Sequence, residues 1–152
     1  MINNFHRGVT VLELLIVVGV LGIIFSIVLP SFQTIKNNSI IQTVASDMFS
    51  ALDKARSQTL SSVDSSEYGV HFQSDKIVIF KGQTYSSSDP GNEEIIISAP
   101  VTISSINLTG GATDLYFDKL SGAPSKIGTI TVSTSSLLKT ITISATGAAS
   151  MN

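Results

Sequence analysis

One ionisable side chain stands inside an otherwise apolar stretch of this sequence. Residues 9–29 read VTVLELLIVVGVLGIIFSIVL, and Glu13 is the one charged residue among them. A carboxylate in a membrane-spanning helix costs about 2.5–3.5 kcal/mol on insertion scales. Glu13 therefore either reaches the membrane surface, four residues inside the stretch, or pairs with a positive group.

The second interpretation needs a cation from outside the apolar stretch, because residues 9–29 contain no Lys or Arg. A free amine at Val9 would serve if the chain were cut between Gly8 and Val9. Within one helix that amine is already near Glu13. Between neighbouring chains, a charge-assisted hydrogen bond from the amine to the carboxylate would fix the axial register of a packed assembly.

Catalytic residue patterns are missing from the sequence. It has no Cys, two His residues, and neither a G-x-S-x-G nor a Walker A motif. His71 stands beside Phe72 in a strand-like run and is interpreted as a half-buried strand residue. Asp114 and Asp118 would lie about 13 Å apart on one face of a strand, too far apart for a cooperating acid pair. We expect no enzymatic activity and no cofactor.

A cation site is the remaining chemical possibility, in an acidic turn. Oxygen ligands of the kind that calcium prefers occur there at high density, at Asp89, Asn92, Glu93 and Glu94. A solvated turn is the favoured interpretation, so the sequence predicts no metal site. The net charge of −2 also provides no basic surface for nucleic acid.

The apolar stretch is long enough to cross a membrane. Its 21 residues would span roughly 30 Å as a helix, the thickness of a bilayer's hydrocarbon core. Arg7 precedes it, and positive charge on that flank keeps the N-terminus cytoplasmic. We therefore expect a single-pass protein of the inner (cytoplasmic) membrane with a periplasmic or extracellular C-terminal domain. The stretch is too long for an ordinary secretory signal.

The segment RGVTVLELL, residues 7–15, resembles the class III signal of type IV pilins and type II secretion pseudopilins. The resemblance implies a leader of residues 1–8, cleavage between Gly8 and Val9 by a prepilin peptidase, and N-methylation of Val9. It also gives Glu13 a role in filament assembly, and it matches Gly22 and Pro30 to the positions where family members bend the helix. One departure is Val9, where the family usually has Phe.

The helix is predicted to continue beyond the membrane. Residues 9–29 form the transmembrane part and residues 30–60 an amphipathic continuation, because apolar residues recur at helical spacing from Ile41 to Ala55. Pro30 should kink the helix by removing one backbone hydrogen bond. The apolar face is expected to pack on a sheet.

Residues 61–152 are predicted to form a β-rich domain. Runs with a period of two and turn residues between them indicate about seven antiparallel strands: 68–73, 76–81, 94–98, 101–108, 114–118, 128–133 and 139–146. The predicted fold class is α+β, a pilin-like arrangement in which a long N-terminal helix packs on an antiparallel β-domain.

The C-terminal two thirds are similar to H-type minor pseudopilins of type II secretion and to FimT/FimU-type minor pilins. The similarity lies in residues 37–60, including Ala55-Arg56-Ser57, and in ITIS at 141–144 followed by Gly147. It implies a structural subunit of a type II secretion pseudopilus or a type IV pilus-like filament. Its partners would be the prepilin peptidase, other pilins or pseudopilins, an inner-membrane assembly platform and membrane lipid.

Three alternatives stay open at this stage: a competence pseudopilin, a DNA-binding minor pilin, and a membrane-anchored domain without any assembly role. DNA binders of this kind use basic C-terminal segments, whereas no basic residue follows Lys139 here. Removing the leader with Arg7 would leave eight basic against eleven acidic side chains, a net charge of −3. Nucleic acid is therefore not an expected partner. Gly8 and Glu13 occur together at the spacing of the class III signal, which argues against a membrane-anchored domain without an assembly role.

Overall fold

The computed structural model describes residues 9–152, except for the side chains of residues 29–34. The chain divides into two compact units, Met1–Lys36 and Asn37–Asn152. Helix α1, Val11–Leu60, contributes to both units. The second unit adds eight strands and two short 3₁₀ turns, η1 (Val63–Ser65) and η2 (Thr109–Gly111).

The ends of α1 are set by hydroxyl residues. Thr10 precedes the first turn, and its Oγ1 accepts a hydrogen bond from the Glu13 backbone N–H at 3.2 Å, an N-cap of the usual kind. At the other end Ser62 adopts the left-handed conformation (φ 53°) and turns the chain out of the helix. No glycine is needed at this C-terminus.

One face of α1 supplies the centre of the second unit. Its buried residues follow the spacing i, i+3, i+4, i+7 expected of a helix that packs by one face. They are Ile41, Val44, Ala45, Met48, Ala51, Leu52 and Ala55. The predicted stripe is confirmed from Ile41 onward and gains Ala51. Ile35, which precedes the predicted stripe, is exposed and lies in the first unit.

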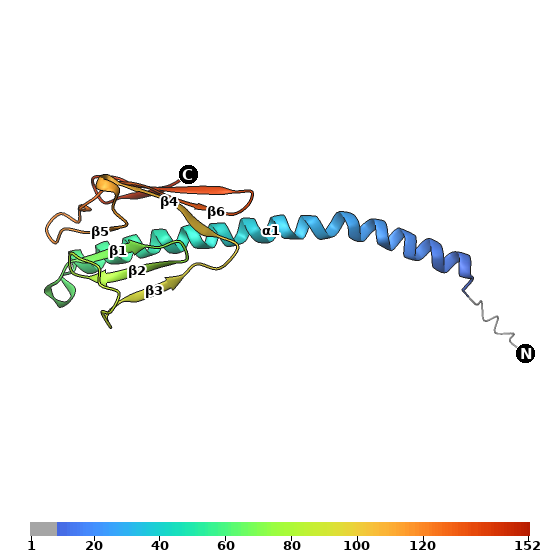
Figure 1. The fold of residues 1–152 in the computed structure, drawn as a ribbon, viewed down its shortest axis with the longest axis horizontal. Coiled ribbons are helices and arrows are strands. Elements are labelled where there is room, and N and C mark those ends of the chain that lie inside the picture. Colours follow the sequence, from blue (N-terminus) through green and yellow to red (C-terminus); the bar gives the residue numbers. More distant parts are fainter. Residues whose placement is uncertain (1–8) are drawn as a thin grey trace, which may run out of the picture. The chain divides into compact units, whose positions relative to one another are not determined.

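The strands form two antiparallel sheets. The first has the order β3-β2-β1-β5, from strands β1 (Tyr68–Phe72), β2 (Lys76–Lys81), β3 (Glu93–Ile96) and β5 (Asp114–Tyr116). The second has the order β4-β6-β7-β8, from β4 (Thr102–Leu108), β6 (Gly128–Ser133), β7 (Leu138–Ile143) and β8 (Ala149–Met151). In Figure 1 the second half of α1 runs between the sheet with β1, β2 and β3 and the sheet with β4 and β6.

The core lies where the two sheets face α1. Val70, Ile77 and Leu115 from the first sheet and Ile130 and Ile141 from the second belong to the same buried cluster as the helix residues. Burying such side chains away from water is the main favourable contribution to folding. The α+β, pilin-like fold class expected from the sequence is confirmed.

Strand β2 is buried on both faces. Val78 and Phe80 point away from the central cluster and are nevertheless buried. The ring of Tyr85 lies 5.7 Å from that of Phe80 in an edge-on arrangement. The polar segment 83–92, expected only as a loop, therefore covers the outer face of the first sheet at this point.

The observed strands differ from the predicted ones mainly at their ends. Strand β5 ends at Tyr116, so Asp118 lies outside it, contrary to the expectation that Asp114 and Asp118 share a strand face. Strand β7 ends at Ile143, and the turn through Gly147 (φ 79°) leads into β8, which was not predicted. After Thr146 the tail TGAASMN has no β-branched or aromatic residue of the kind typical of strands, so local composition could not identify β8.

Met48 tests the importance of the helix face. It is fully buried, whereas its neighbour Phe49 is 41% exposed. We expect Met48→Ala to lower the free energy of unfolding by about 2–4 kcal/mol through lost contacts and a cavity. Phe49→Ala, which removes more apolar atoms, should cost roughly 1 kcal/mol.

Urea titration of the full-length protein in detergent would compare the two variants. Tyrosine fluorescence is a suitable probe, because the chain has no Trp and its three Tyr residues all lie beyond α1. Equal losses of stability would contradict the assignment of Met48 to the packed face.

Candidate assembly site

The first turn of α1 holds the carboxylate that the sequence singled out. Thr10 and Glu13 occupy the N-cap and N3 positions of a capping box, T-x-x-E, and the Leu14 N–H also donates to the Thr10 carbonyl at 3.1 Å. A negative side chain in the first turn is favoured by the helix dipole. The Glu13 side chain is exposed, as is Val9, at 74%.

The apolar side chains of Val11–Val28 are exposed in the part of the chain that the structure describes. Val11–Val28 has a mean hydropathy of 2.9 and none of it is buried. At 1.5 Å per residue, its 18 residues extend about 27 Å, close to the thickness of a bilayer core. By length and composition this helix can cross a membrane. Its exposed apolar residues need lipid or other helices around them, because soluble proteins rarely leave such a continuous patch in water.

The residues between Gly22 and Pro30 remain helical in the backbone. Nothing lies within 4 Å of a Cβ placed on Gly22. The Ser26 hydroxyl donates to the Ile23 carbonyl at 2.7 Å, a bond that often accompanies helix bending. Pro30 has no N–H for the Ser26 carbonyl one turn earlier. The bend at Gly22 and Pro30 stays a prediction.

The predicted processing site lies next to Val9, the first residue that the structure describes. Gly8 is outside the described residues, and Val9 precedes the helix without regular structure. Val9 lies directly before the N-cap residue Thr10, and Glu13 lies three residues after it. Among described residues, Glu13 has no ion pair. The structure thus presents Glu13 to whatever surrounds the helix.

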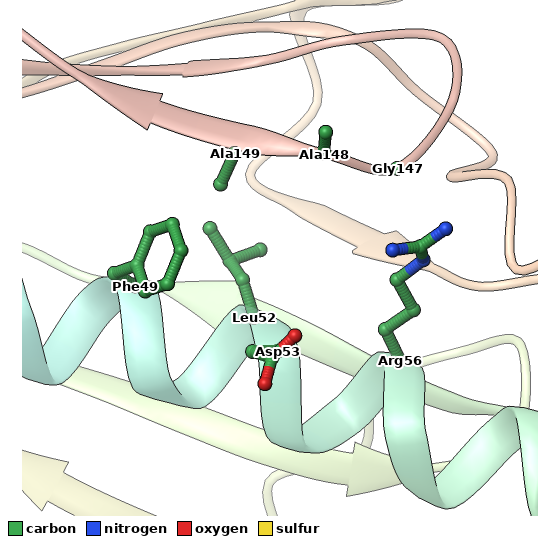
Figure 2. Close-up of a pocket in the computed structure, with 7 residues that line it drawn as sticks. All are labelled: Phe49, Leu52, Asp53, Arg56, Gly147, Ala148 and Ala149. Carbon is green, nitrogen blue, oxygen red and sulfur yellow. The ribbon is translucent and has the colours of Figure 1, made fainter.

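Arg56 joins the helix to two distant segments of the second unit. Its Nε donates to the Gly122 carbonyl and its Nη2 to the Thr146 carbonyl, both at 3.0 Å. Figure 2 shows its guanidinium group beside the strand end at Gly147. The bonds tie α1 to the β5–β6 connection and to the turn between β7 and β8. In the sequence, Arg56 and Gly147 stood out only because they match H-type minor pseudopilins, and their contact was not predicted.

Glycines permit this approach. A Cβ on Gly147 would lie 2.3 Å from the Gly122 carbonyl oxygen and 2.9 Å from Arg56 Nε. Gly122 and Gly147 both have positive φ, 64° and 79°. The backbone and the guanidinium group can therefore meet only where side chains are missing.

Thr59 makes a similar connection in the interior. It is the one buried polar residue found among the described residues. Its hydroxyl donates to the Ala55 carbonyl at 2.9 Å and accepts from the Tyr68 N–H at 2.8 Å. The last turn of α1 is thereby bonded to the start of β1, and the hydroxyl has both a donor and an acceptor partner.

A shallow groove lies beside the Arg56 contact. Its volume is about 170 Å³, and Phe49, Leu52, Asp53 and Arg56 form its helix side. Residues Gly147, Ala148 and Ala149 form the opposite side, as Figure 2 shows. The groove holds one carboxylate and one guanidinium group and no nucleophile paired with a base.

His71 lies in β1 opposite Asp114 and stacks on Tyr85, with ring centres 3.9 Å apart. Burial lowers the pKa of His71, although the nearby Asp114 carboxylate acts in the opposite direction. The ring is therefore neutral near pH 7. It lies in a strand and half-buried, as the sequence suggested.

The candidate calcium ligands have other partners. Glu93 and Glu94 pair with Lys54 and Lys76, each at 2.6 Å. Asp89 accepts the Gly91 N–H at 2.8 Å, and the Asn92 side chain donates to the Ser86 carbonyl. No cluster of three His, Cys, Asp or Glu side chains with metal-binding spacing occurs among the residues that the structure describes.

Asp118 also serves a turn. Its Oδ1 accepts the backbone N–H groups of Leu120 and Ser121 at 2.8 and 3.1 Å. These bonds, with Leu120 first, lower the pKa of Asp118. The carboxylate stabilises the loop after β5 and does not face Asp114 across a site.

Comparison with known proteins identifies the second unit. A family model described as type II transport protein GspH matches residues 44–147. The chain belongs to the GspH family. No curated protein and no solved structure matched the chain in the same comparisons. GspH proteins are structural pseudopilins of type II secretion and not an enzyme family, so the resemblance inferred from the sequence is confirmed.

The GspH match covers the Arg56 contact, the first sheet and strands β4, β6 and β7 of the second, and ends at Gly147. Glu13 and the apolar part of α1 precede the matched region, and β8 follows it. The family assignment therefore rests on the packed domain. The N-terminal features add a membrane-compatible helix to it.

Two glycines with the same backbone angle test the Arg56 contact. Gly147 and Gly110 have φ of 79° and 80°, but nothing lies within 4 Å of a Cβ on Gly110. Both Gly→Ala changes lower the stability because alanine must adopt a positive φ. Only Gly147→Ala also forces the Gly122 carbonyl and Arg56 apart. We expect Gly147→Ala to cost about 2 kcal/mol more than Gly110→Ala in urea unfolding. Equal costs would show that Arg56 does not depend on the close approach.

Proposed function

We propose that this GspH-family chain is a minor structural subunit of a type II secretion pseudopilus that joins the filament through its N-terminal helix. The observation that carries the proposal is the fully exposed apolar segment Val11–Val28 with a single carboxylate in its first turn. A filament core of packed helices would cover this surface. In the membrane before assembly, lipid would cover it.

Glu13 would control entry into the filament. In the membrane both Glu13 and a free Val9 amine can reach water at the interface, so pairing gains little there. In a packed core both groups lose water, and leaving either unpaired would cost several kcal/mol. A Glu13 carboxylate bonded to the amine of a neighbouring subunit is compensated only in the correct axial register. The pair would select register more than it adds net stability.

The amine exists only if the leader is removed. We propose that a prepilin peptidase cuts between Gly8 and Val9 and that the new N-terminus is methylated, with the N-terminus on the cytoplasmic side and the β-domain in the periplasm. The Thr10 cap supports this arrangement, because helix α1 needs nothing before Val9 to complete its first turn.

Processing is tested by intact-mass spectrometry of the protein from cells with the complete secretion machinery. Loss of eight of the 152 residues should give a mature chain of 144 that begins at N-methylated Val9. Gly8→Val should remain uncut and still insert in the membrane, since the apolar segment is unchanged. A mature N-terminus elsewhere would remove the basis for pairing Glu13 with Val9.

The pairing is tested by expressing wild-type and Glu13→Gln chains together in such cells. We expect the variant to be cut, to stay in the membrane, to fold its β-domain and to be depleted from filaments by at least about tenfold, equivalent to 1.4 kcal/mol. Glu67→Gln, the same chemical change in the second unit, should enter normally. Quantitative mass spectrometry of sheared filaments measures both. Equal incorporation of Glu13→Gln would support the interpretation that Glu13 merely reaches the membrane surface.

A further inference from the structure

The two sheets have four edges, and three of them are closed to further pairing. Strand β3 carries two charged residues, Glu93 and Glu94, which pair with Lys54 of α1 and Lys76 of β2. The backbone N–H and C=O of Tyr116 in β5 are both bonded to Ser125. Charged side chains and covering loops are common ways to prevent a sheet edge from recruiting another strand.

The third edge is interrupted by a bulge. The register of β4 against β6 shifts between Ile103 and Ser105, and the Ser104 hydroxyl bonds to the Thr131 carbonyl. A bulge increases the local twist and makes an edge a poor template for pairing. Only the edge formed by β8 has none of these features among the described residues.

Strand β8 presents an ordered row of free backbone groups. Thr140 and Asn152 exchange both hydrogen bonds at 3.0 Å, and the Ser144 N–H donates to the Ala148 carbonyl. Bonds alternate along an antiparallel pair, so Ala148, Ser150 and Asn152 face β7. The N–H and C=O groups of Ala149 and Met151 therefore point away from β7, along the open edge. Residues 148–152 carry no charge, proline or bulge.

The groove beside this edge has matching side chains. Phe49, 41% exposed, offers an apolar surface next to Ala149, and the buried Leu52 lies at the base of the groove. Asp53 is exposed and forms no ion pair within residues 9–152, and Arg56 is engaged by two carbonyls. An added strand would place one side chain on Phe49 and bring a cation to Asp53.

We propose that the β8 edge binds an extended segment of a different subunit of the same filament, by β-strand addition. The segment carries a small or apolar residue over Phe49 and a Lys or Arg near Asp53. Backbone bonds to Ala149 and Met151 provide the attachment, and the groove provides selectivity. The identity of the partner as a filament subunit rests on the proposed function.

A second copy of this chain fits the edge less well. Figure 2 places Ala149 near Phe49 and Gly147 near Arg56, so β8 runs antiparallel to α1. Two β8 strands paired antiparallel would put the Asn37 ends of the two helices at opposite ends of the pair. Subunits stacked in one direction along a filament need their Asn37 ends to point the same way, so antiparallel pairing of two β8 strands does not fit the proposed filament.

Photocrosslinking of the full-length chain in cells with the complete machinery tests the proposal. Phe49 is replaced by p-benzoylphenylalanine, and the adduct is sequenced by mass spectrometry. We expect an adduct with one segment of another pseudopilin. Ala149→Pro removes an outward N–H, a change that edge strands tolerate, and should reduce the adduct at least about tenfold. Ser150→Ala, whose backbone faces β7, should leave it unchanged, and Asp53→Lys should weaken it.

Urea unfolding of the Ala149→Pro and Asp53→Lys variants shows whether the β-domain of each variant remains folded. If Ala149→Pro does not fold, the Asp53→Lys variant still tests the proposal. An adduct with this chain's own sequence, or one insensitive to both changes, overturns the proposal. Filament incorporation of the wild-type chain is measured in the same cells. If the wild-type chain enters filaments normally but no adduct forms, strand addition is overturned and the filament role is not. If an adduct that depends on Ala149 forms but the chain does not enter filaments, the filament role is overturned and strand addition is not.

Discussion

Burial of one face of α1 between two sheets is the interaction on which the rest of the structure depends. Each sheet alone has an apolar face with nothing to cover it, and the helix residues from Ile41 to Ala55 cover both. The described chain has no disulfide or metal cluster to replace this contact. Thr59 and Arg56 then fix the end of the helix against β1 and the β7–β8 turn by hydrogen bonds.

The same helix has a different requirement in its first unit. Between Val11 and Val28 the apolar residues surround the helix and find no partner in the chain. The second unit is thus satisfied internally, while the first unit depends on lipid or neighbouring helices. This division explains why a chain with a complete domain still contains an exposed surface, and why a single carboxylate there can matter.

Much of the fold followed from local patterns. The helix, the hairpin of β1 and β2, and the core face from Ile41 onward were predictable because hydrophobic period and turn residues act over a few positions. The division into two sheets, the cover over Phe80 and the strand β8 were not, because they depend on contacts between distant segments. Glu13 and Gly8 stood out by type and spacing. Among the described residues Glu13 has no ion pair, and the partner proposed for it belongs to a neighbouring chain, which no pattern within one sequence can locate. Arg56 stood out in the sequence, but its hydrogen bonds could not be predicted, because both acceptors are backbone carbonyls, which have no sequence signature.

The bond from Arg56 to Thr146 spans 90 positions of the chain. A ribosome adds about 5–20 residues per second, so roughly five to twenty seconds separate the synthesis of the donor from that of its acceptor. During that interval the inner face of α1 has been made, but the second sheet that covers it is still incomplete. Apolar surface exposed during synthesis favours aggregation, so the order of the segments along the chain leaves the helix face uncovered until most of the protein has been made.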